Sequence, residues 1–229
     1  MRYQLVSFPI CPYVQRARIL LDAKGIDYDT SYIDLDDKPD WFTERVPTAK
    51  VPALFVGDTT LFESNVITEY LDDVSSMPLL PDEPLQRATE KAWIAYSDSW
   101  LMSLFRALKS ENKPEYAKQV NSLLEGCDNA RSFIESRLAH GYRLGAFEIA
   151  VAPLLLRIRK VPDIRAAFRE RFKDSSRIGL WAQTVLSEDA VQGSLPDDFD
   201  ERFSRFFDLD NPAHPANISA LGRLTESAA

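Results

Sequence analysis

Phe8-Pro9-Ile10-Cys11-Pro12-Tyr13-Val14 places a cysteine between a strand pattern at 3–8 and an amphipathic helix pattern at 13–24. Apolar residues recur in the helix at the i, i+3, i+4 spacing of one buried face. Pro12 suits the first helical turn, and Gly25 suits the left-handed position that ends a helix. We therefore expect Cys11 beside unpaired backbone N–H groups and the positive end of the helix dipole, which favour a reactive thiolate.

The composition is that of an ordinary globular protein, with 229 residues of which 45% are hydrophobic and 27% charged. A formal net charge of -8 argues against nucleic acid and anionic membrane surfaces, because both select basic patches. No apolar run approaches the roughly 20 residues of a membrane span. The first residues lack a signal-peptide pattern. We expect a cytoplasmic protein with no nucleic-acid or membrane partner.

The chain has two cysteines, Cys11 and Cys127, and two histidines. This count excludes a disulfide framework, and the spacing shows no metal-ligand pattern, so no metal is expected. A lone cysteine is commonly a small buried hydrophobe. A Cys-Pro-aromatic sequence at a strand-to-helix turn is a partly exposed, electropositive setting, which favours a chemical role for Cys11.

Residues 1–76 alternate between strand and helix patterns. The third helix is expected to have Ser64 as its N-cap and an apolar face of Val66, Ile67, Tyr70, Leu71 and Val74. The order βαβ, helix, ββα is that of a thioredoxin-like domain. The expected strands lie at 3–8, 28–35, 53–56 and 60–62, and the first two helices at 13–24 and 39–45, with a turn at Gly57-Asp58.

Three prolines within 78–84 mark residues 77–84 as a stiff linker. Residues 85–207 are expected to form an all-helical domain, so the fold class is α/β plus all-α, with a C-terminal helical bundle. A Pro/Ala/Ser-rich stretch at 208–229 is expected to be an extended or disordered tail. The expected helices run through 93–108 and about 115–139, 147–160, 163–172, 177–188 and 200–207.

The following motifs stand in a specific order: Cys11-Pro12-Tyr13, Arg16-Ala17-Arg18, Ala23-Lys24-Gly25-Ile26, Lys38-Pro39-Asp40-Trp41-Phe42, Val51-Pro52-Ala53-Leu54, Glu63-Ser64 and Leu79-Leu80-Pro81-Asp82. Each motif alone is weak, but their order and spacing together are specific. In these motifs the chain resembles the cytosolic glutathione transferases over about 1–207, and within them the omega-like, cysteine-type branch.

The resemblance implies a glutathione site with Cys11 as the catalytic residue. A cis Val51-Pro52 bond would present the backbone of Val51 to the extended tripeptide. Alternatively, Pro52 merely starts a strand, Ser64 only caps its helix and Lys38 is a solvated lysine. Lys50 departs from the family pattern, where a small or apolar residue is usual, and could help to bind a carboxylate. The implied glutathione-binding residues are Pro12, Tyr13, Lys38, Lys50, Val51, Pro52, Glu63 and Ser64.

The resemblance also implies an acceptor pocket in the helical domain and a homodimer. Aromatic residues at helical spacing are more often core than pocket. The family's Ser-x-x-Asp capping box is here Gly145 and Glu148, so half of the box is retained and a less firmly fixed helix start is expected. The implied pocket residues are Tyr96, Trp100, Arg157, Phe199 and Phe206.

The resemblance implies a thiol transferase or glutathione-dependent reductase, in which Cys11 forms a mixed disulfide with glutathione. Its reactions include deglutathionylation, dehydroascorbate reduction and removal of glutathione from thioether adducts, with a small hydrophobic or disulfide acceptor. Val14 stands where a dithiol glutaredoxin has its second cysteine, so a monothiol mechanism is expected. Two alternatives remain open: conjugation of glutathione to electrophiles, and a transferase-like scaffold without catalysis.

Overall fold

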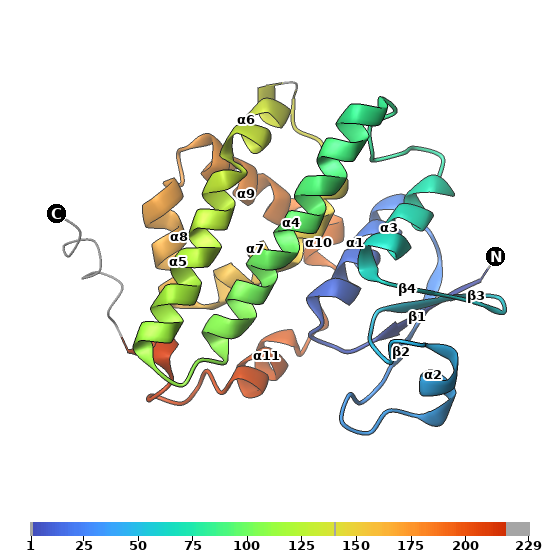
Figure 1. Cartoon of the computed structure of the whole chain (residues 1–229), viewed down its shortest axis with the longest axis horizontal. Coiled ribbons are helices and arrows are strands. Elements are labelled where there is room, and N and C mark those ends of the chain that lie inside the picture. Colours follow the sequence, from blue (N-terminus) through green and yellow to red (C-terminus); the bar gives the residue numbers. More distant parts are fainter. Residues whose placement is uncertain (1, 140, 219–229) are drawn as a thin grey trace. The chain divides into compact units, whose positions relative to one another are not determined.

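The computed structural model describes residues 2–139 and 141–218 (Figure 1). They form two compact units, each assembled from separate stretches of the chain. The domain boundaries expected from the sequence stay a prediction, because these units do not follow the chain continuously. The first unit holds the described residues of Met1–Ile94, Leu144–Pro153 and Ser187–Phe199, and the second those of Ala95–Arg143, Leu154–Leu186 and Asp200–Ala229.

The first unit contains a four-stranded mixed sheet with the strand order β2-β1-β3-β4. β1 (Tyr3–Ser7) pairs in parallel with β2 (Tyr28–Tyr32) and antiparallel with β3 (Ala53–Val56). β3 continues through a hairpin into β4 (Thr59–Phe62), and Gly57 takes the left-handed conformation at the turn. β2 ends three residues earlier than expected. The predicted order of elements and the fold class are confirmed.

Helices cover both faces of this sheet. α1 (Pro12–Lys24) packs against α3 (Ser64–Asp73), and Tyr70 of α3 makes an edge contact with Tyr3 of β1 at 6.4 Å between ring centroids. On the opposite face, Phe42 of α2 (Asp40–Arg45) is buried in one cluster with Val6 and Phe55. The two faces alternate along β1, as the period of two requires.

The ends of α1 are those expected from its sequence. Pro12 is the first helical residue, and Gly25 ends the helix with φ of 61°. The Gly25 N–H donates to Asp22 O, and the Ile26 N–H donates to Leu21 O, so the last carbonyl groups are satisfied.

The expected apolar face of α3 is only partly correct. Ile67 and Leu71 are fully buried, whereas Val66 and Val74 are each 51% exposed. The buried residues of α3 also include the acidic Asp72. Polar contacts therefore replace part of the apolar packing at the end of this helix.

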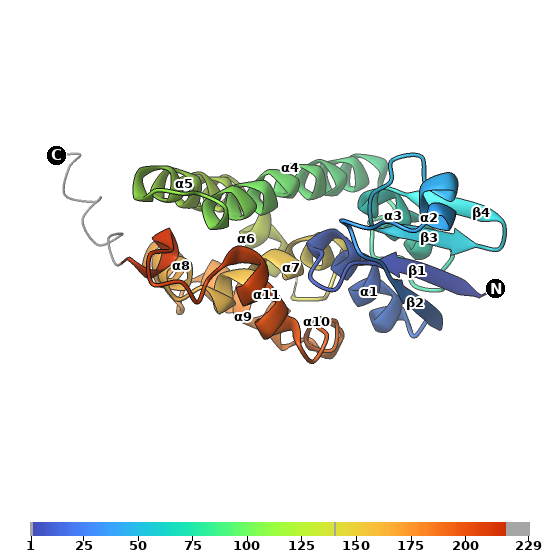
Figure 2. The ribbon, with the colours of Figure 1, turned by 90° about the horizontal axis from the view of Figure 1, so that it is seen from below.

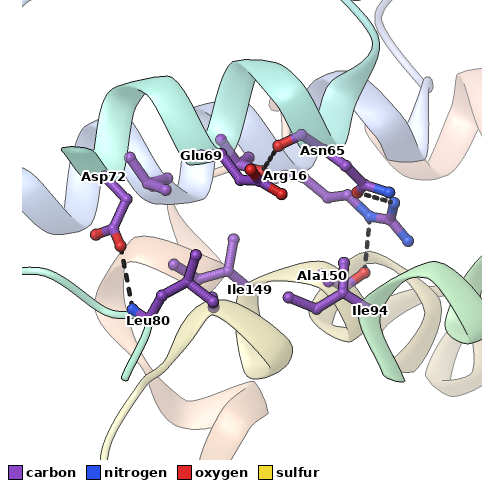
Figure 3. A pocket seen from close by; sticks show the side chains of 11 residues that line it. Arg16, Asn65, Glu69, Asp72, Leu80, Ile94, Ile149 and Ala150 are labelled. Carbon is purple, nitrogen blue, oxygen red and sulfur yellow. Dashed lines mark hydrogen bonds between the residues drawn. The ribbon is translucent and has the colours of Figure 1, made fainter. Parts of the chain in front are cut away.

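A crevice in the first unit is bordered by α1, α3 and α7 (Ala146–Lys160), and buried polar groups line it (Figure 3). Arg16 of α1 is 1% exposed. Its Nε donates to Ala150 O on α7 at 2.9 Å, and its Nη1 donates to Asn65 Oδ1 on α3 at 3.2 Å. The crevice has a volume of about 20 Å³, enough for one water molecule.

Asp72 anchors the chain that leaves α3. Its carboxylate accepts hydrogen bonds from the backbone N–H groups of Leu79 at 2.8 Å and Leu80 at 3.1 Å. Lys24 Nζ, at the end of α1, lies 3.2 Å from Asp72 Oδ1, and the two side chains are only 6% and 3% exposed. This buried ion pair thus ties the ends of α1 and α3 to residues 79–80.

The second unit is helical (Figure 2). In this unit the C-terminal part of α4 lies beside α5, and α8 and α9 form a further layer. The expected helix at 115–139 is wrong in one respect, because it is two helices separated at Ala130. Asp128 accepts a hydrogen bond from Arg131 at this break, at 2.6 Å. The helices are α4 (Pro84–Leu108), α5 (Lys113–Asn129), α6 (Arg131–Ala139), α8 (Pro162–Phe172) and α9 (Arg177–Ser187).

The start of α7 has a substitute for its incomplete capping box. Glu148 Oε2 accepts a hydrogen bond from the Gly145 N–H at 3.1 Å, so the retained half of the box works as expected. Glu90 of α4, 2% exposed, accepts from the Phe147 N–H at 3.2 Å. A carboxylate from another helix therefore performs the task that glycine cannot, and the less firmly fixed start of α7 stays a prediction.

The last elements are α10 (Asp189–Gln192), α11 (Phe199–Phe207) and a short 3-10 helix at Pro215–Asn217. The sequence predicts neither α10 nor the 3-10 helix. His214 is buried, its Nε2 lies 3.1 Å from Leu108 O, and its Nδ1 accepts from the Ala216 N–H. The expectation of an extended or disordered tail is therefore wrong for 208–218, and 219–229 lie outside the described residues.

Substitution of Asp72 by alanine should lower the free energy of unfolding by about 3–5 kcal/mol, because it leaves Lys24 buried without its counter-charge. Asp73→Ala removes the adjacent, exposed carboxylate and should change stability by less than about 0.5 kcal/mol. Urea denaturation followed by circular dichroism measures both. An equal decrease in the free energy of unfolding in both variants would show that the buried ion pair contributes no more to stability than an exposed carboxylate.

Candidate functional site

The register of the sheet brings three separated segments to one edge. Val6, near the end of β1, pairs with Ala53 at the start of β3, and Ala53 pairs with Phe62 at the end of β4. The segment that follows β1, the residues before Ala53 and the residues after Phe62 therefore lie at the same end of the sheet. These segments carry Cys11, Val51-Pro52 and Glu63-Ser64.

Cys11 is the N-cap residue of α1 and is partly exposed. Its backbone N–H donates to Phe8 O at 3.0 Å, and its carbonyl accepts from the Gln15 N–H at 3.2 Å, which closes the first helical turn. The side chain makes no capping hydrogen bond. The positive end of the helix dipole stabilises negative charge at this position, so the site suits a nucleophilic thiolate.

The Val51-Pro52 peptide bond is cis, as the sequence resemblance predicts. Cys11 Sγ lies 4.0 Å from Val51 O. The sulfur is therefore next to the backbone segment that could pair with an extended peptide, and Pro52 itself is buried.

The N-terminus of α3 differs by one residue from the prediction. Glu63, with φ of 67°, is the N-cap, and Ser64 is the first helical residue. The reason is that Glu63 turns the chain in the left-handed region directly after β4, so the helix begins at once. Ser64 is 7% exposed, whereas Glu63 in the same turn is an exposed residue.

Lys50 and Glu63 are exposed charged residues of the segments at this edge, and Lys38 is an exposed residue of the loop between β2 and α2. None of them has a hydrogen bond or an ion pair within residues 2–139 and 141–218. Two cations and one anion match a ligand with two carboxylates and one ammonium group.

Pro12 and Tyr13 form the first turn of α1. Pro12 occupies the first helical position, and the Arg16 guanidinium lies over the Tyr13 ring at 5.1 Å from its centroid. Tyr13 is partly buried, and it follows Cys11 by two residues. Its ring therefore contacts Arg16 close to the cysteine.

The residues expected to line an acceptor pocket are distributed over both units. Phe199 belongs to the first unit, and Tyr96, Trp100, Arg157 and Phe206 belong to the second. That these residues line one acceptor pocket stays a prediction. The contacts of each residue within its own unit are as follows.

Trp100 is 2% exposed and packs on Gly126, where an added Cβ would lie 2.5 Å from the indole ring. Tyr96 is partly exposed, and its hydroxyl accepts from Asn129 Nδ2 at 2.9 Å. Arg157 and Phe199 are buried. Phe206 is exposed, and Lys109 Nζ lies 4.3 Å from its ring centroid.

Cys127 differs sharply from Cys11. It is buried in α5, and burial, with a smaller contribution from neighbouring Asp128, raises the pKa of its thiol to about 12. The thiol therefore stays protonated near neutral pH and is a poor nucleophile.

One part of the site has no signal in the sequence. Ser194, Leu195 and Pro196 line a recess of about 10 Å³ together with Cys11 and Gln15. No local pattern indicates that a stretch beyond α9 contacts α1, since the contact depends on how the chain returns to the first unit. A C-terminal stretch thus supplies a wall beside the cysteine.

Among the described residues, no cluster of histidine, cysteine and carboxylate side chains could hold a metal ion. A search of the same residues finds no helix that combines the length and the apolar character needed to traverse a bilayer.

A family model described as "Glutathione S-transferase, N-terminal domain" matches residues 10–74. The pyrimidodiazepine synthase of Drosophila melanogaster is 41% identical over 109 residues, which are 45% of each chain. Glutathione S-transferase U17 of Arabidopsis thaliana is 29% identical over 85% of this chain and 90% of its own. Glutathione S-transferase omega-1 of Mus musculus is 33% identical over 57% of this chain and 58% of its own.

Two solved structures share the fold over nearly the whole chain. The Tau class glutathione S-transferase of mango has a TM-score of 0.75 at 25% identity and covers 90% of this chain and 97% of its own. Glutathione transferase Omega 1C of Trametes versicolor has a TM-score of 0.73 at 25% identity, with the same coverage of 90% and 97%. Residues 10–74 therefore match a glutathione S-transferase N-terminal domain, and the chain as a whole is similar in sequence and in fold to glutathione transferases of the omega and tau classes.

Proposed function

We propose that this chain is an omega-like glutathione transferase of the cysteine type, a glutathione-dependent thiol transferase or reductase. The observation that carries the proposal is the position of Cys11, a partly exposed helix N-cap whose Sγ lies 4.0 Å from Val51 O beside a cis-proline. A tyrosine or serine hydroxyl at such a position can only stabilise the thiolate of glutathione. A cysteine can itself attack sulfur.

The reaction proceeds through a mixed disulfide. The Cys11 thiolate attacks the glutathionyl sulfur of a mixed disulfide, RS–SG, and displaces RS⁻, which takes a proton from water to give RSH. A second glutathione thiolate then attacks the glutathionyl sulfur bound to Cys11. This step releases oxidised glutathione and restores the Cys11 thiolate. In the net reaction the mixed disulfide RS–SG and one glutathione thiol give RSH and oxidised glutathione, whose second half comes from the mixed disulfide.

Each group at the sheet edge has a task in glutathione binding. The backbone of Val51 pairs with the cysteinyl part of the tripeptide, and the Ser64 hydroxyl at the N-terminus of α3 binds the γ-glutamyl carboxylate. Glu63 binds the ammonium group of the same residue. Lys38 and Lys50 bind the glycyl carboxylate. Pro12 and Tyr13 shape the turn that presents Cys11.

The acceptor is a small hydrophobic molecule or a disulfide, bound with the help of Tyr96, Arg157 and Phe206. Dehydroascorbate and thioether adducts of glutathione are further acceptors of this chemistry. The family is usually dimeric, and we propose a homodimer in the cytoplasm.

Incubation with oxidised glutathione should place a glutathione adduct on Cys11, and Cys11→Ser should abolish both the adduct and the reductase activity. Mass spectrometry of the intact chain and its peptides detects the adduct, and glutathione-coupled reduction of a mixed disulfide measures the activity. Cys127→Ser is the matched control and should behave as the wild type, because the pKa of about 12 keeps that thiol protonated. Full reductase activity in Cys11→Ser would exclude the mechanism. Turnover of a chlorinated aromatic by Cys11→Ser would instead indicate conjugation.

Glu63→Gln should raise the KM for glutathione by about ten- to a hundredfold, because the loss of a charged hydrogen bond costs about 1.5–3 kcal/mol. The rate at which iodoacetamide alkylates Cys11 should not change, since Glu63 acts on the ligand and not on the thiol. Glu44→Gln, which removes an exposed carboxylate on α2, controls for the change in net charge. An equal KM in the Glu63 and Glu44 variants would remove Glu63 from the site, and failure of the wild type to bind a glutathione resin would favour a non-catalytic scaffold.

A further inference from the structure

A stretch between α10 and α11 packs against the start of α1. α10 contacts α1, and Ser194, Leu195 and Pro196 border the same small recess as Cys11. The recess has room for one water molecule and is too small for an acceptor. This side of Cys11 is therefore occupied by protein, and the contacts there support the helix rather than bind substrate.

A chain of hydrogen bonds joins this stretch to α1. Gln15 Nε2 donates to Ser194 Oγ at 2.8 Å, and Ser194 Oγ donates to Val191 O at 2.6 Å. Gln15 is 4% exposed and Ser194 is 2% exposed, so water cannot easily replace either partner. Because the hydroxyl both accepts and donates, Val191 fixes the direction in which it accepts from Gln15.

Gln15 connects this chain to Cys11. Its backbone N–H donates to Cys11 O at 3.2 Å, the hydrogen bond that closes the first turn of α1. The backbone of Gln15 thus holds the turn, while its side chain is held by Ser194. A helix end frays readily when its side chains are not anchored, and a frayed first turn no longer directs its N–H groups at the N-cap residue.

We propose that Gln15 and Ser194 are positioning residues that hold the first turn of α1 around the Cys11 thiolate. The inference rests on the proposed function, in which this thiolate is the nucleophile. Neither residue belongs to the proposed glutathione-binding set, so their loss should affect the reactivity of Cys11 and not the affinity for glutathione.

Ser194→Ala tests this through the pH dependence of Cys11 alkylation. Iodoacetamide labelling, followed on the peptide that contains Cys11, should be about threefold slower than in the wild type at mildly acidic pH and equal at alkaline pH, where both thiols are ionised. The kcat for mixed-disulfide reduction should fall by a similar factor, with an unchanged KM for glutathione. Ser194→Thr, which keeps the hydroxyl, should restore the wild-type values.

Asp197→Asn alters an exposed residue of the same stretch and should leave the alkylation profile unchanged. If Ser194→Ala does not fold, as judged by circular dichroism, Gln15→Met removes the same hydrogen bond from the other side. A wild-type alkylation profile in the folded variant would overturn the inference, even if its activity were lower. A shifted profile in a chain whose wild type forms no glutathione adduct would support the positioning role and contradict the proposed function.

Discussion

The antiparallel pairing of β1 with β3 determines where the chemistry of this chain lies. It sets Val6 opposite Ala53, and the hairpin sets Ala53 opposite Phe62. A slip of one residue would turn every side chain of β3 to the other face and move Val51-Pro52 away from the segment that follows β1. The buried residues on both faces, among them Leu5, Leu54 and Phe55, prevent such a slip because each would lose its apolar contacts. The distance of 4.0 Å between Cys11 Sγ and Val51 O is thus a consequence of the core.

Buried polar side chains then connect the helices of the first unit to segments that are remote in the sequence. Arg16 reaches α3 and α7, Gln15 reaches Ser194, Glu90 caps α7, and the Lys24–Asp72 pair binds residues 79–80. Apolar packing alone would allow these segments to slide, since it is not directional. Hydrogen bonds between buried groups allow only one arrangement, because each displaced group would remain unsatisfied. This unit therefore combines an apolar core with a small set of directional contacts.

Local patterns in the sequence predicted most elements of the fold and the three segments of the candidate site. The turn around Cys11 and the start of α3 depend on residues next to one another, so a local pattern contains them, whereas the cis-proline is implied only by the resemblance to a family. The hydrogen bond that the glycine at position 145 cannot accept from the Phe147 N–H is accepted by Glu90 on α4, and the wall beside Cys11 comes from residues 194–196. Both depend on tertiary folding, which no local pattern records. The exposure of Val66 and Val74 has the same origin, since helical spacing indicates a face but not what covers it.

The two cysteines define what can complete a reaction cycle at Cys11. Val14, one turn further along α1, is 1% exposed and carries no thiol that could resolve a mixed disulfide. Cys127 is buried, and its pKa of about 12 leaves it protonated at neutral pH. Exchange needs an attacking thiolate with access to the disulfide, and neither position provides one. A mixed disulfide on Cys11 must therefore be resolved by a thiol from solution.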